Sequence, residues 1–217
     1  MKITTNGREA TVRHHTVPSP ATPQHRPARL VIGISGATGI RYGVRALELI
    51  GDIAETHLVI SKAAAATIAL EYPDGIDAVR DRAHAVHSVG DIGATIASGS
   101  FPVDGMLIAP CAGRTLAAIA HGLSDNLLTR AAEVTLKERR RLVILYRETP
   151  FTLAHLRNMT AVTEMGGIVM PPVPAFYLEP TSVDDIVDHT VIRALDLLGF
   201  PAADAPRWDG ITSPRHP

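Results

Sequence analysis

The sequence predicts an α/β protein with a Rossmann-like, three-layer sandwich, in which helices cover both faces of a parallel β-sheet. Two observations carry this prediction. Short apolar runs alternate with helix-like segments along most of the chain, and several of the runs end in Gly, Ser or Pro. The length of 217 residues, of which 46% are hydrophobic, fits one domain with a substantial core.

The strands are expected where short apolar runs meet turn residues. Residues 29–35 (RLVIGIS) form the first run, which ends in glycines. Later runs of the same kind are HLVIS at 57–61, GMLIA at 105–109 and LVILY at 142–146, with shorter strands near 84–88 and at 167–170. Runs of this length, bounded by turn residues, are typical of buried strands in parallel sheets.

The helices are expected between these strands, at 41–50, 62–71, 113–121, 126–140, 150–165 and 181–198. Thr149 as N-cap and Pro150 as first helical residue predict the start of the fifth helix. Thr181 or Ser182, with Asp185 in the first turn, predicts the start of the last one. Residues 74–103 are ambiguous apart from the short strand.

The two ends of the chain differ from its centre. Residues 1–27 carry four prolines and no periodicity, so we interpret them as a flexible arm that precedes a domain over 28–200. The tail over 201–217 has the same composition but holds the only tryptophan, Trp208. We therefore expect part of the tail to dock on the domain.

Composition excludes several classes of function. A net charge of −1 argues against a nucleic-acid binder, and no apolar stretch is long enough to span a membrane. The start of the sequence lacks an apolar signal core, which predicts a cytoplasmic protein. Cys111 is the single cysteine, so internal disulfides are excluded, and His84 and His87 lack the further ligands that would predict a metal site.

The turn after the first strand is glycine-rich. Ligands of such folds bind beyond the carboxyl ends of the strands, where amides at a helix start can bind phosphate. The spacing of Gly33, Gly36 and Gly39 departs from the dinucleotide fingerprint, and Ser61-Lys62 stands where an acidic residue would bind ribose. NAD(P) is thus disfavoured, and both an FMN phosphate and a turn without ligand stay open.

Two further strand ends carry polar residues. The loop 112–115 can form a second anion site at a helix start, whereas we expect Cys111 before it to be a small buried residue and not a nucleophile. Arg147 and Glu148 follow the strand at 142–146 and could bind a phosphate and move a proton, or form a surface pair.

Several cations and aromatic residues lie outside the strand ends. Arg130 and Lys137 are seven residues apart on one helix, so they project from one stripe about 10 Å apart, where they either bind a ligand or flank the core. Three prolines hold Phe176 and Tyr177 in a stiff connection. Arg193 lies at the border of the apolar face of the last helix.

Taken together, these motifs resemble the flavin prenyltransferase (UbiX-type) family over roughly residues 29–208. The long block 123–150 is the most distinctive part. The motifs are GISGATG at 33–39, LVISKAA at 58–64, LSDNLLTRAAEVTLKERR at 123–140, RETP at 147–150, PPVPAFY at 171–177 and PRW at 206–208.

The resemblance implies a flavoprotein fold and a metal-independent reaction. The family transfers a dimethylallyl group from dimethylallyl phosphate to N5 and C6 of reduced FMN. The prenylated FMN product serves a partner UbiD-type decarboxylase. The family also implies a homo-oligomer, expected to be a dodecamer, with sites shared between subunits.

The resemblance also implies roles for particular residues. Residues matching the FMN site are Gly36, Ala37, Thr38, Ser61, Ala112, Gly113, Arg114, Thr115 and Arg147. Those matching the prenyl-phosphate site are Arg130, Lys137, Tyr177 and Arg193, with Trp208 near the prenyl chain. Glu148 matches a catalytic acid–base, and Lys137 and Glu71 match further catalytic positions. Ala112 departs from the family, which usually has serine there, so a hydroxyl donor to the flavin is missing.

Two other functions compete with this interpretation. The first is a flavin-dependent cysteine decarboxylase, which would need an early catalytic histidine and an Asn-rich motif that we do not find. The second is a non-catalytic FMN carrier, against which the retained Glu148, Lys137 and Arg193 argue.

Overall fold

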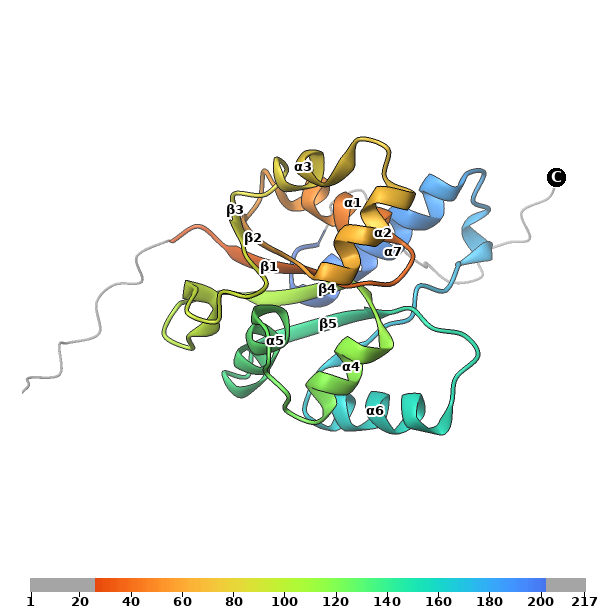
Figure 1. Ribbon diagram of the computed structural model, residues 1–217. Coiled ribbons are helices and arrows are strands. Elements are labelled where there is room, and N and C mark those ends of the chain that lie inside the picture. Colours follow the sequence, from red (N-terminus) through yellow and green to blue (C-terminus); the bar gives the residue numbers. More distant parts are fainter. Residues whose placement is uncertain (1–25, 202–217) are drawn as a thin grey trace, which may run out of the picture.

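The computed structural model describes residues 26–201, which form a six-stranded, all-parallel sheet of order β3-β2-β1-β4-β5-β6. Figure 1 shows the central strands β1, β4 and β5 running side by side. The strands are β1 (Arg29–Ile34), β2 (Glu55–Ile60), β3 (Ala85–His87), β4 (Gly105–Cys111), β5 (Arg141–Tyr146) and β6 (Ile168–Val169). This order is that of a doubly wound dinucleotide-binding sheet, so the predicted fold class is confirmed.

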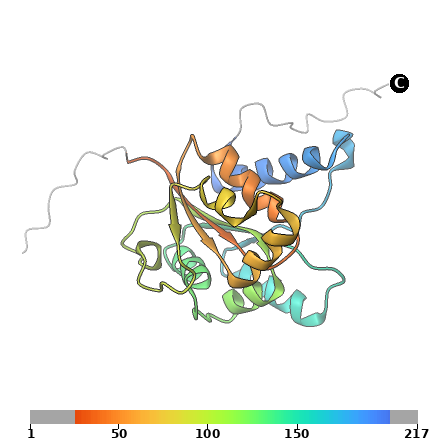
Figure 2. The same ribbon diagram turned by 45° about the horizontal axis from the view of Figure 1, so that its top comes forward.

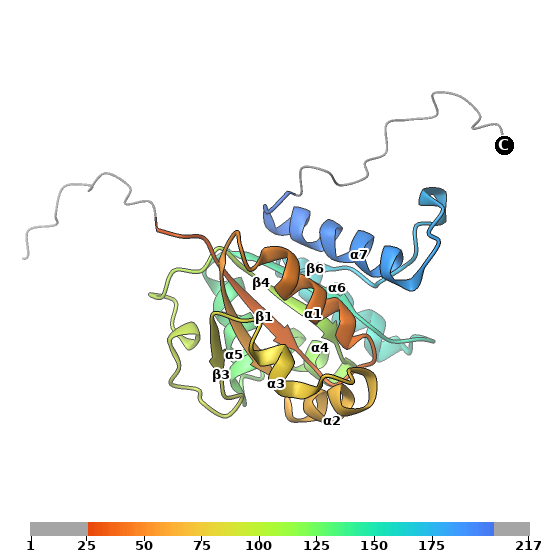
Figure 3. The ribbon, with the colours of Figure 1, turned by 90° about the horizontal axis from the view of Figure 1, so that it is seen from above.

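Helices cover both faces of the sheet. One face carries α1 (Ile40–Ile50), α2 (Lys62–Glu71), α3 (Gly75–Arg80) and α7 (Val183–Leu198). The opposite face carries α4 (Gly113–Ala120), α5 (Leu127–Lys137) and α6 (Leu153–Glu164). Figures 2 and 3, seen from above, show α7 lying along α1 on one side of the sheet. Two short 3₁₀ turns, η1 (Thr95–Ala97) and η2 (Phe176–Leu178), lie in the connections.

Two apolar cores follow from the alternation of side chains along the strands. Leu30, Ile32 and Ile34 of β1 point to the first face and pack with α1, α2 and α7. Val31 points to the other face, where it joins Met106 of β4 and the apolar residues of α4 and α5. Burial on both faces explains why these strands read as continuous apolar runs in the sequence.

Two sequence predictions about helices are wrong in detail. The helix expected at 150–165 begins at Leu153, because Thr152 and not Thr149 is its N-cap: the Thr152 hydroxyl accepts from His155 N–H, and His155 accepts from Thr152 N–H. The helix expected to reach 140 ends at Lys137, since Arg139 has a φ of 57° that no right-handed helix allows. In addition, the ambiguous 74–103 segment contains α3 and η1.

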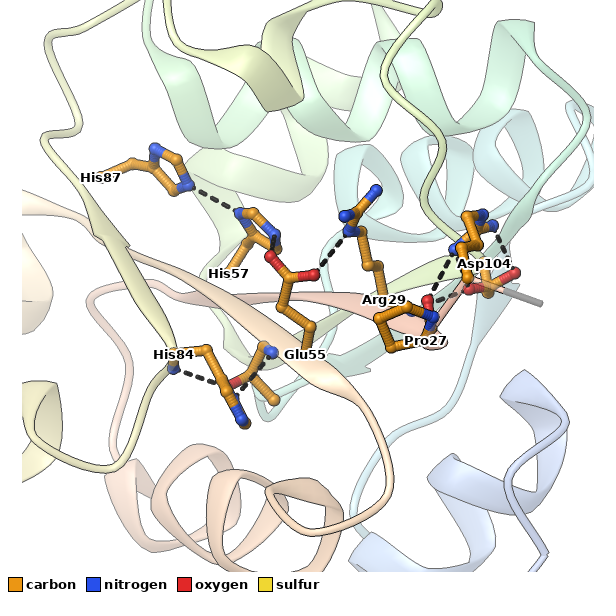
Figure 4. Close-up of polar contacts among 9 residues, drawn as sticks. Pro27, Arg29, Glu55, His57, His84, His87 and Asp104 are labelled. Atoms are coloured by element: carbon orange, nitrogen blue, oxygen red, sulfur yellow. Dashed lines mark hydrogen bonds and ion pairs between the residues drawn. The ribbon is translucent and has the colours of Figure 1, made fainter. Parts of the chain in front are cut away.

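The amino edge of the sheet is tied together by polar side chains (Figure 4). His57 Nδ1 lies 2.9 Å from His87 Nε2, and Glu55 accepts from Arg29 at 2.7 Å. His84 bonds Thr56, and Arg26 and the Arg29 amide both donate to Asp104. His84 and His87 therefore both make hydrogen bonds within the fold. Residues 26–201 contain no group of three or more His, Cys, Asp or Glu side chains that could hold a metal ion.

The remaining sequence predictions concern the chain ends. Arg26 and Pro27, expected in the flexible arm, lie against Asp104. The rest of the arm, and the tail with Trp208, lie outside the described residues. In the described part of the chain, the helices are too short or too polar to cross a membrane.

Candidate active site

The candidate site lies where the connections after β1 and β4 leave the sheet toward opposite faces. These two central strands are adjacent, and α1 follows one on the first face while α4 follows the other on the second face. Ser35 joins the strand ends: its hydroxyl donates to Pro110 O at 3.0 Å and accepts from Ala112 N–H at 2.7 Å. A crevice at such a switch point is the usual ligand site of this fold.

A cleft of about 450 Å³ opens at this point, within the range of small-molecule sites. It gathers five of the predicted FMN-binding residues, which come from the three connections after β1, β2 and β4. Its lining consists of Gly36, Ser61, Lys62, Ala63, Val89, Gly90, Ala112, Arg114, Thr115, Asp125, Asn126 and Leu128.

The start of α4 offers this cleft backbone amides without a side-chain cap. Ala112 is the N-cap of α4 and supplies no side-chain cap, so the first amides of the helix depend on other partners. By contrast, α2, α5, α6 and α7 each have a side-chain N-cap. Ser61 caps α2 by accepting from Ala64 N–H at 3.0 Å, which leaves its own proton to donate. A phosphate placed at the α4 start would meet helix amides and nearby hydroxyls.

The other walls of the cleft suit a flat, largely apolar ring system. Ala63, Val89 and Leu128 are apolar, and Arg114 and Asp125 form an ion pair at its outer side. Because the Arg114 guanidinium is paired with Asp125, the backbone of Arg114 is more available to a ligand than its side chain. The predicted FMN site residues did not include Asp125 and Asn126, although the motif containing them and their N-cap pattern were visible in the sequence.

The Glu71 side chain caps the start of α1. Its Oε2 accepts from Gly39 N–H at 2.8 Å and from Ile40 N–H at 3.0 Å, and Thr38 donates to the same side chain. Burial opposes ionisation of Glu71, yet these hydrogen bonds and the nearby charge of Arg147 outweigh it and lower its pKa. The Gly39 and Ile40 amides are therefore occupied by Glu71 in this structure.

Gly36 remains next to the cleft, for a steric reason. A Cβ at this position would lie 2.3 Å from Ala63 Cβ, so only glycine allows the turn after β1 to pack on α2. Ala37, between Gly36 and Thr38, lies in the same turn but does not line the cleft.

Glu148 stands at the carboxyl end of β5, close to the start of α4. Its Oε1 accepts from Thr149 N–H at 3.1 Å, and its Oε2 lies 3.8 Å from where a Cβ of Gly113 would stand. Arg147 is exposed, and its charge reaches Glu71. Cys111 is fully buried, and burial raises the pKa of its thiol, so the prediction of an inert buried cysteine is confirmed.

Arg130 and Lys137 do not join this cluster within one chain. Both side chains face the segment around η1: Arg130 Nε donates to Ala97 O at 3.2 Å, and Lys137 lies beside Gly99 in an ion pair with Glu138. The shared stripe is confirmed. Lys137 lies away from the strand ends of the same chain, because α5 runs back to the amino ends of the strands before β5 begins.

The remaining predicted substrate ligands are also separate. Tyr177 is 55% exposed in the segment before α7, on the side of the molecule where the strands end (Figure 1). Arg193 lies on α7 and pairs with Asp196 at 3.3 Å. Trp208 lies outside the described residues.

The fold and the cleft define an α/β flavoprotein, and comparison with known proteins supports this class. A protein-family model described as "Flavoprotein" matches residues 18–195. The chain is 59% identical over 184 residues to "Flavin prenyltransferase UbiX" of Neisseria meningitidis serogroup B, covering 84% of this chain and 97% of that protein. It is also 50% identical to a "Probable UbiX-like flavin prenyltransferase" of Bacillus subtilis, covering 84% of this chain and 90% of that one.

Solved structures agree. The structure of AnUbiX (PadA1) in complex with FMN and dimethylallyl pyrophosphate matches with a TM-score of 0.83 and 47% identity, over 85% of this chain and 99% of that one. A dodecameric FMN-dependent UbiX-like decarboxylase from Escherichia coli O157:H7 matches with a TM-score of 0.81 and 47% identity, over 84% of this chain and 100% of that one.

The chain therefore belongs to the UbiX flavin prenyltransferase family, and it is a prenyltransferase. The predicted resemblance is confirmed. An FMN-dependent cysteine decarboxylase, TvaF, shares 15% identity at a TM-score of 0.53, which shows a common fold alone.

Proposed function

We propose that this chain transfers a dimethylallyl group from dimethylallyl phosphate to reduced FMN and so makes prenylated FMN. Membership of the UbiX family carries this proposal, together with a cleft of suitable size at the switch point of the sheet. The AnUbiX structure binds FMN and dimethylallyl pyrophosphate and shares the fold over nearly its whole length.

The residues at the cleft fit a flavin that carries a phosphate. The uncapped start of α4 and the Ser61 hydroxyl would bind the anionic end, while Ala63, Val89 and Leu128 would pack on the ring. Reduced FMN, when bound, would supply the nucleophilic atoms that form bonds to the dimethylallyl group as its phosphate leaves. Ala112 offers no hydroxyl, and its own N–H is already bound by Ser35.

The chemistry that this chain must supply is stabilisation of a leaving phosphate. Positive charge develops on the allyl group as the phosphate departs, so preorganised cations around the phosphate lower the barrier. Arg147 at the strand ends fits this role, with Lys137, Arg130, Arg193 and Tyr177 as further donors. Glu148 can hold or deliver the proton that the reaction moves.

Those donors are separated in one chain, so we propose that neighbouring copies complete the site. Lys137 is at the amino edge of the sheet and is nearly half exposed, with a side-chain exposure of 46%. Exposed apolar residues surround the strand-end side, among them Phe151, Leu153, Phe176 and Tyr177. The E. coli relative is dodecameric, and a dodecamer of this chain would bury such surfaces.

The recipient of the product is proposed to be a UbiD-type decarboxylase, which needs prenylated FMN. The cytoplasmic location stays a prediction of the sequence. A carrier that only stores FMN would need neither Glu148 nor a set of phosphate-binding cations, and this difference makes the two functions separable by experiment.

The test is an anaerobic reaction of the purified oligomer with reduced FMN and either dimethylallyl monophosphate or diphosphate. Chromatography of the extracted flavin should show a new species that requires both protein and donor. The comparison of the two donors measures the preference for one phosphate or two. Bound but unaltered flavin with both donors would support the carrier instead.

A further inference from the structure

Three polar side chains meet beside the first residue of α4, outside the cleft described above. A Cβ built on Gly113 would lie 3.6 Å from Tyr146 Oη, 3.8 Å from Glu148 Oε2 and 3.8 Å from His155 Nε2. They come from β5, from the loop after it and from α6, and Gly113 leaves the space between them open. Neither Tyr146 nor His155 was assigned a role from the sequence.

The Tyr146 hydroxyl is buried and has no hydrogen-bond partner among residues 26–201. The ring itself is well packed: it stacks on Phe151 with centroids 5.9 Å apart and meets the His155 ring edge-on at 6.1 Å. Burial, and then the charge of Glu148, raise the pKa of Tyr146, so the phenol keeps its proton. A protonated buried hydroxyl that lacks an acceptor is costly unless it serves a purpose.

The capping box of α6 fixes which nitrogen of His155 donates. His155 Nδ1 accepts from Thr152 N–H at 3.2 Å, so the neutral ring carries its proton on Nε2. Nε2–H is the atom that faces the shared space. Glu148 has the complementary arrangement, since Thr149 N–H occupies Oε1 and Oε2 faces the same space.

We propose that His155 and Tyr146 are positioning residues for Glu148: their two donors and its free oxygen line one space beside Gly113, so that the carboxyl, when it turns into this space, is held by both donors at the start of α4. The proposal rests on the proposed function, in which Glu148 handles the proton. The other ionisable groups nearby do not compete, because Cys111 is buried with a raised thiol pKa and Arg114 on α4 is paired with Asp125. Arg147, adjacent in sequence, interacts with Glu71.

Two variants separate this role from a structural one. His155→Gln keeps a capping-box acceptor at the third residue of α6 but removes the ring donor, and Tyr146→Phe removes only the unpartnered hydroxyl. Tyr146→Phe should be at least as stable to urea as wild type, since it removes a buried unpartnered hydroxyl, and His155→Gln should unfold near the wild-type urea concentration. In both variants kcat should fall about tenfold or more while KM for FMN changes little. His121→Gln, at the exposed far end of α4, is the matched control and should behave as wild type.

A second readout does not depend on turnover. In histidine-labelled protein at constant pH, NMR should show the His155 ring signals moving when Glu148→Gln replaces the neighbouring carboxylate, while the His121 signals stay in place. Wild-type kcat in both His155→Gln and Tyr146→Phe would overturn the proposal, as would unchanged His155 signals in Glu148→Gln. If the wild-type protein makes no prenylated flavin, the proposed function fails by itself, and the NMR comparison alone decides whether His155 and Glu148 interact.

Discussion

Lys137 and Glu148 lie at opposite ends of the same strand, Lys137 at the amino end of β5 and Glu148 at its carboxyl end. Lys137 ends α5 just before β5 (Arg141–Tyr146), and Glu148 follows that strand. At about 3.3 Å per residue, the six residues of β5 alone separate them by about 17–20 Å. A pocket that needs both side chains must therefore take them from different copies of the chain.

This arrangement predicts that two inactive variants complement each other. Lys137→Ala and Glu148→Gln should each lose most activity alone. Mixed oligomers, made by co-expression with two affinity tags and tandem purification, should regain about one quarter of the wild-type rate, since random mixing leaves that share of sites intact. The control is the oligomer in which every copy carries both Lys137→Ala and Glu148→Gln, so that no site can be intact. Activity no higher than that of either parent would mean that one chain supplies both residues.

Glu71 is predicted to stabilise the fold by closing the start of α1. Glu71→Gln removes the charge that faces the helix dipole and should lower the free energy of unfolding by about 1 kcal/mol at neutral pH. Because folding lowers the pKa of Glu71 below its ordinary value of 4.5, this contribution is complete above that pH and is lost as pH falls through the folded-state pKa. Urea unfolding of both proteins should thus converge in acid. A difference that persists undiminished in acid, where Glu71 is protonated in both the folded and the unfolded protein, would rule out the charge as its source.

Ser35 is predicted to align the two loops that flank the cleft. Ser35→Ala leaves Ala112 N–H without its hydroxyl partner, whereas Pro110 O keeps the hydrogen bond from the Ser35 backbone N–H. The unpaired Ala112 N–H should cost about 1–3 kcal/mol of unfolding free energy. FMN binding should weaken as well, because the α4 start loses its link to β1. Isothermal titration with FMN, paired with urea unfolding, checks both effects. Ser124→Ala, at the surface and bonded to Glu133, serves as the comparison.

We predict that Ala112→Ser makes the protein more stable and its binding of FMN tighter. At the N-cap of α4, a serine oxygen can accept from an amide of the first turn, and this should raise the free energy of unfolding by about 1 kcal/mol. The serine proton would remain free to donate to the flavin, so the Kd for FMN should fall severalfold. Ala112→Gly lacks the hydroxyl and should give neither gain. Unchanged thermal unfolding of Ala112→Ser would show that the α4 amides are already satisfied.

The sequence predicts the fold well because its signals are local. The apolar runs of β1, β4 and β5 are buried on both faces, and Ser182 is the N-cap of α7 that Asp185 in the first turn indicates. The α6 start was misplaced because Thr149 and Thr152 both suit an N-cap, and only the reciprocal bond with His155 selects the second.

The site was less predictable, since it depends on contacts between distant segments. Residue type alone does not show that Glu71 reaches back over thirty residues to Gly39, or that α5 carries Lys137 away from the strand ends. Tyr146 reads as a core residue at the end of an apolar strand, and only its unpartnered hydroxyl beside Gly113 marks it out.

The central claim is that this chain attaches a prenyl group to its flavin. The most direct measurement is the mass of the flavin extracted after anaerobic incubation with reduced FMN and dimethylallyl phosphate. We predict a mass increase of one C5 unit in the wild-type oligomer and almost none in Glu148→Gln with FMN still bound. Wild-type protein that binds FMN and the donor yet returns FMN of unchanged mass would contradict the account.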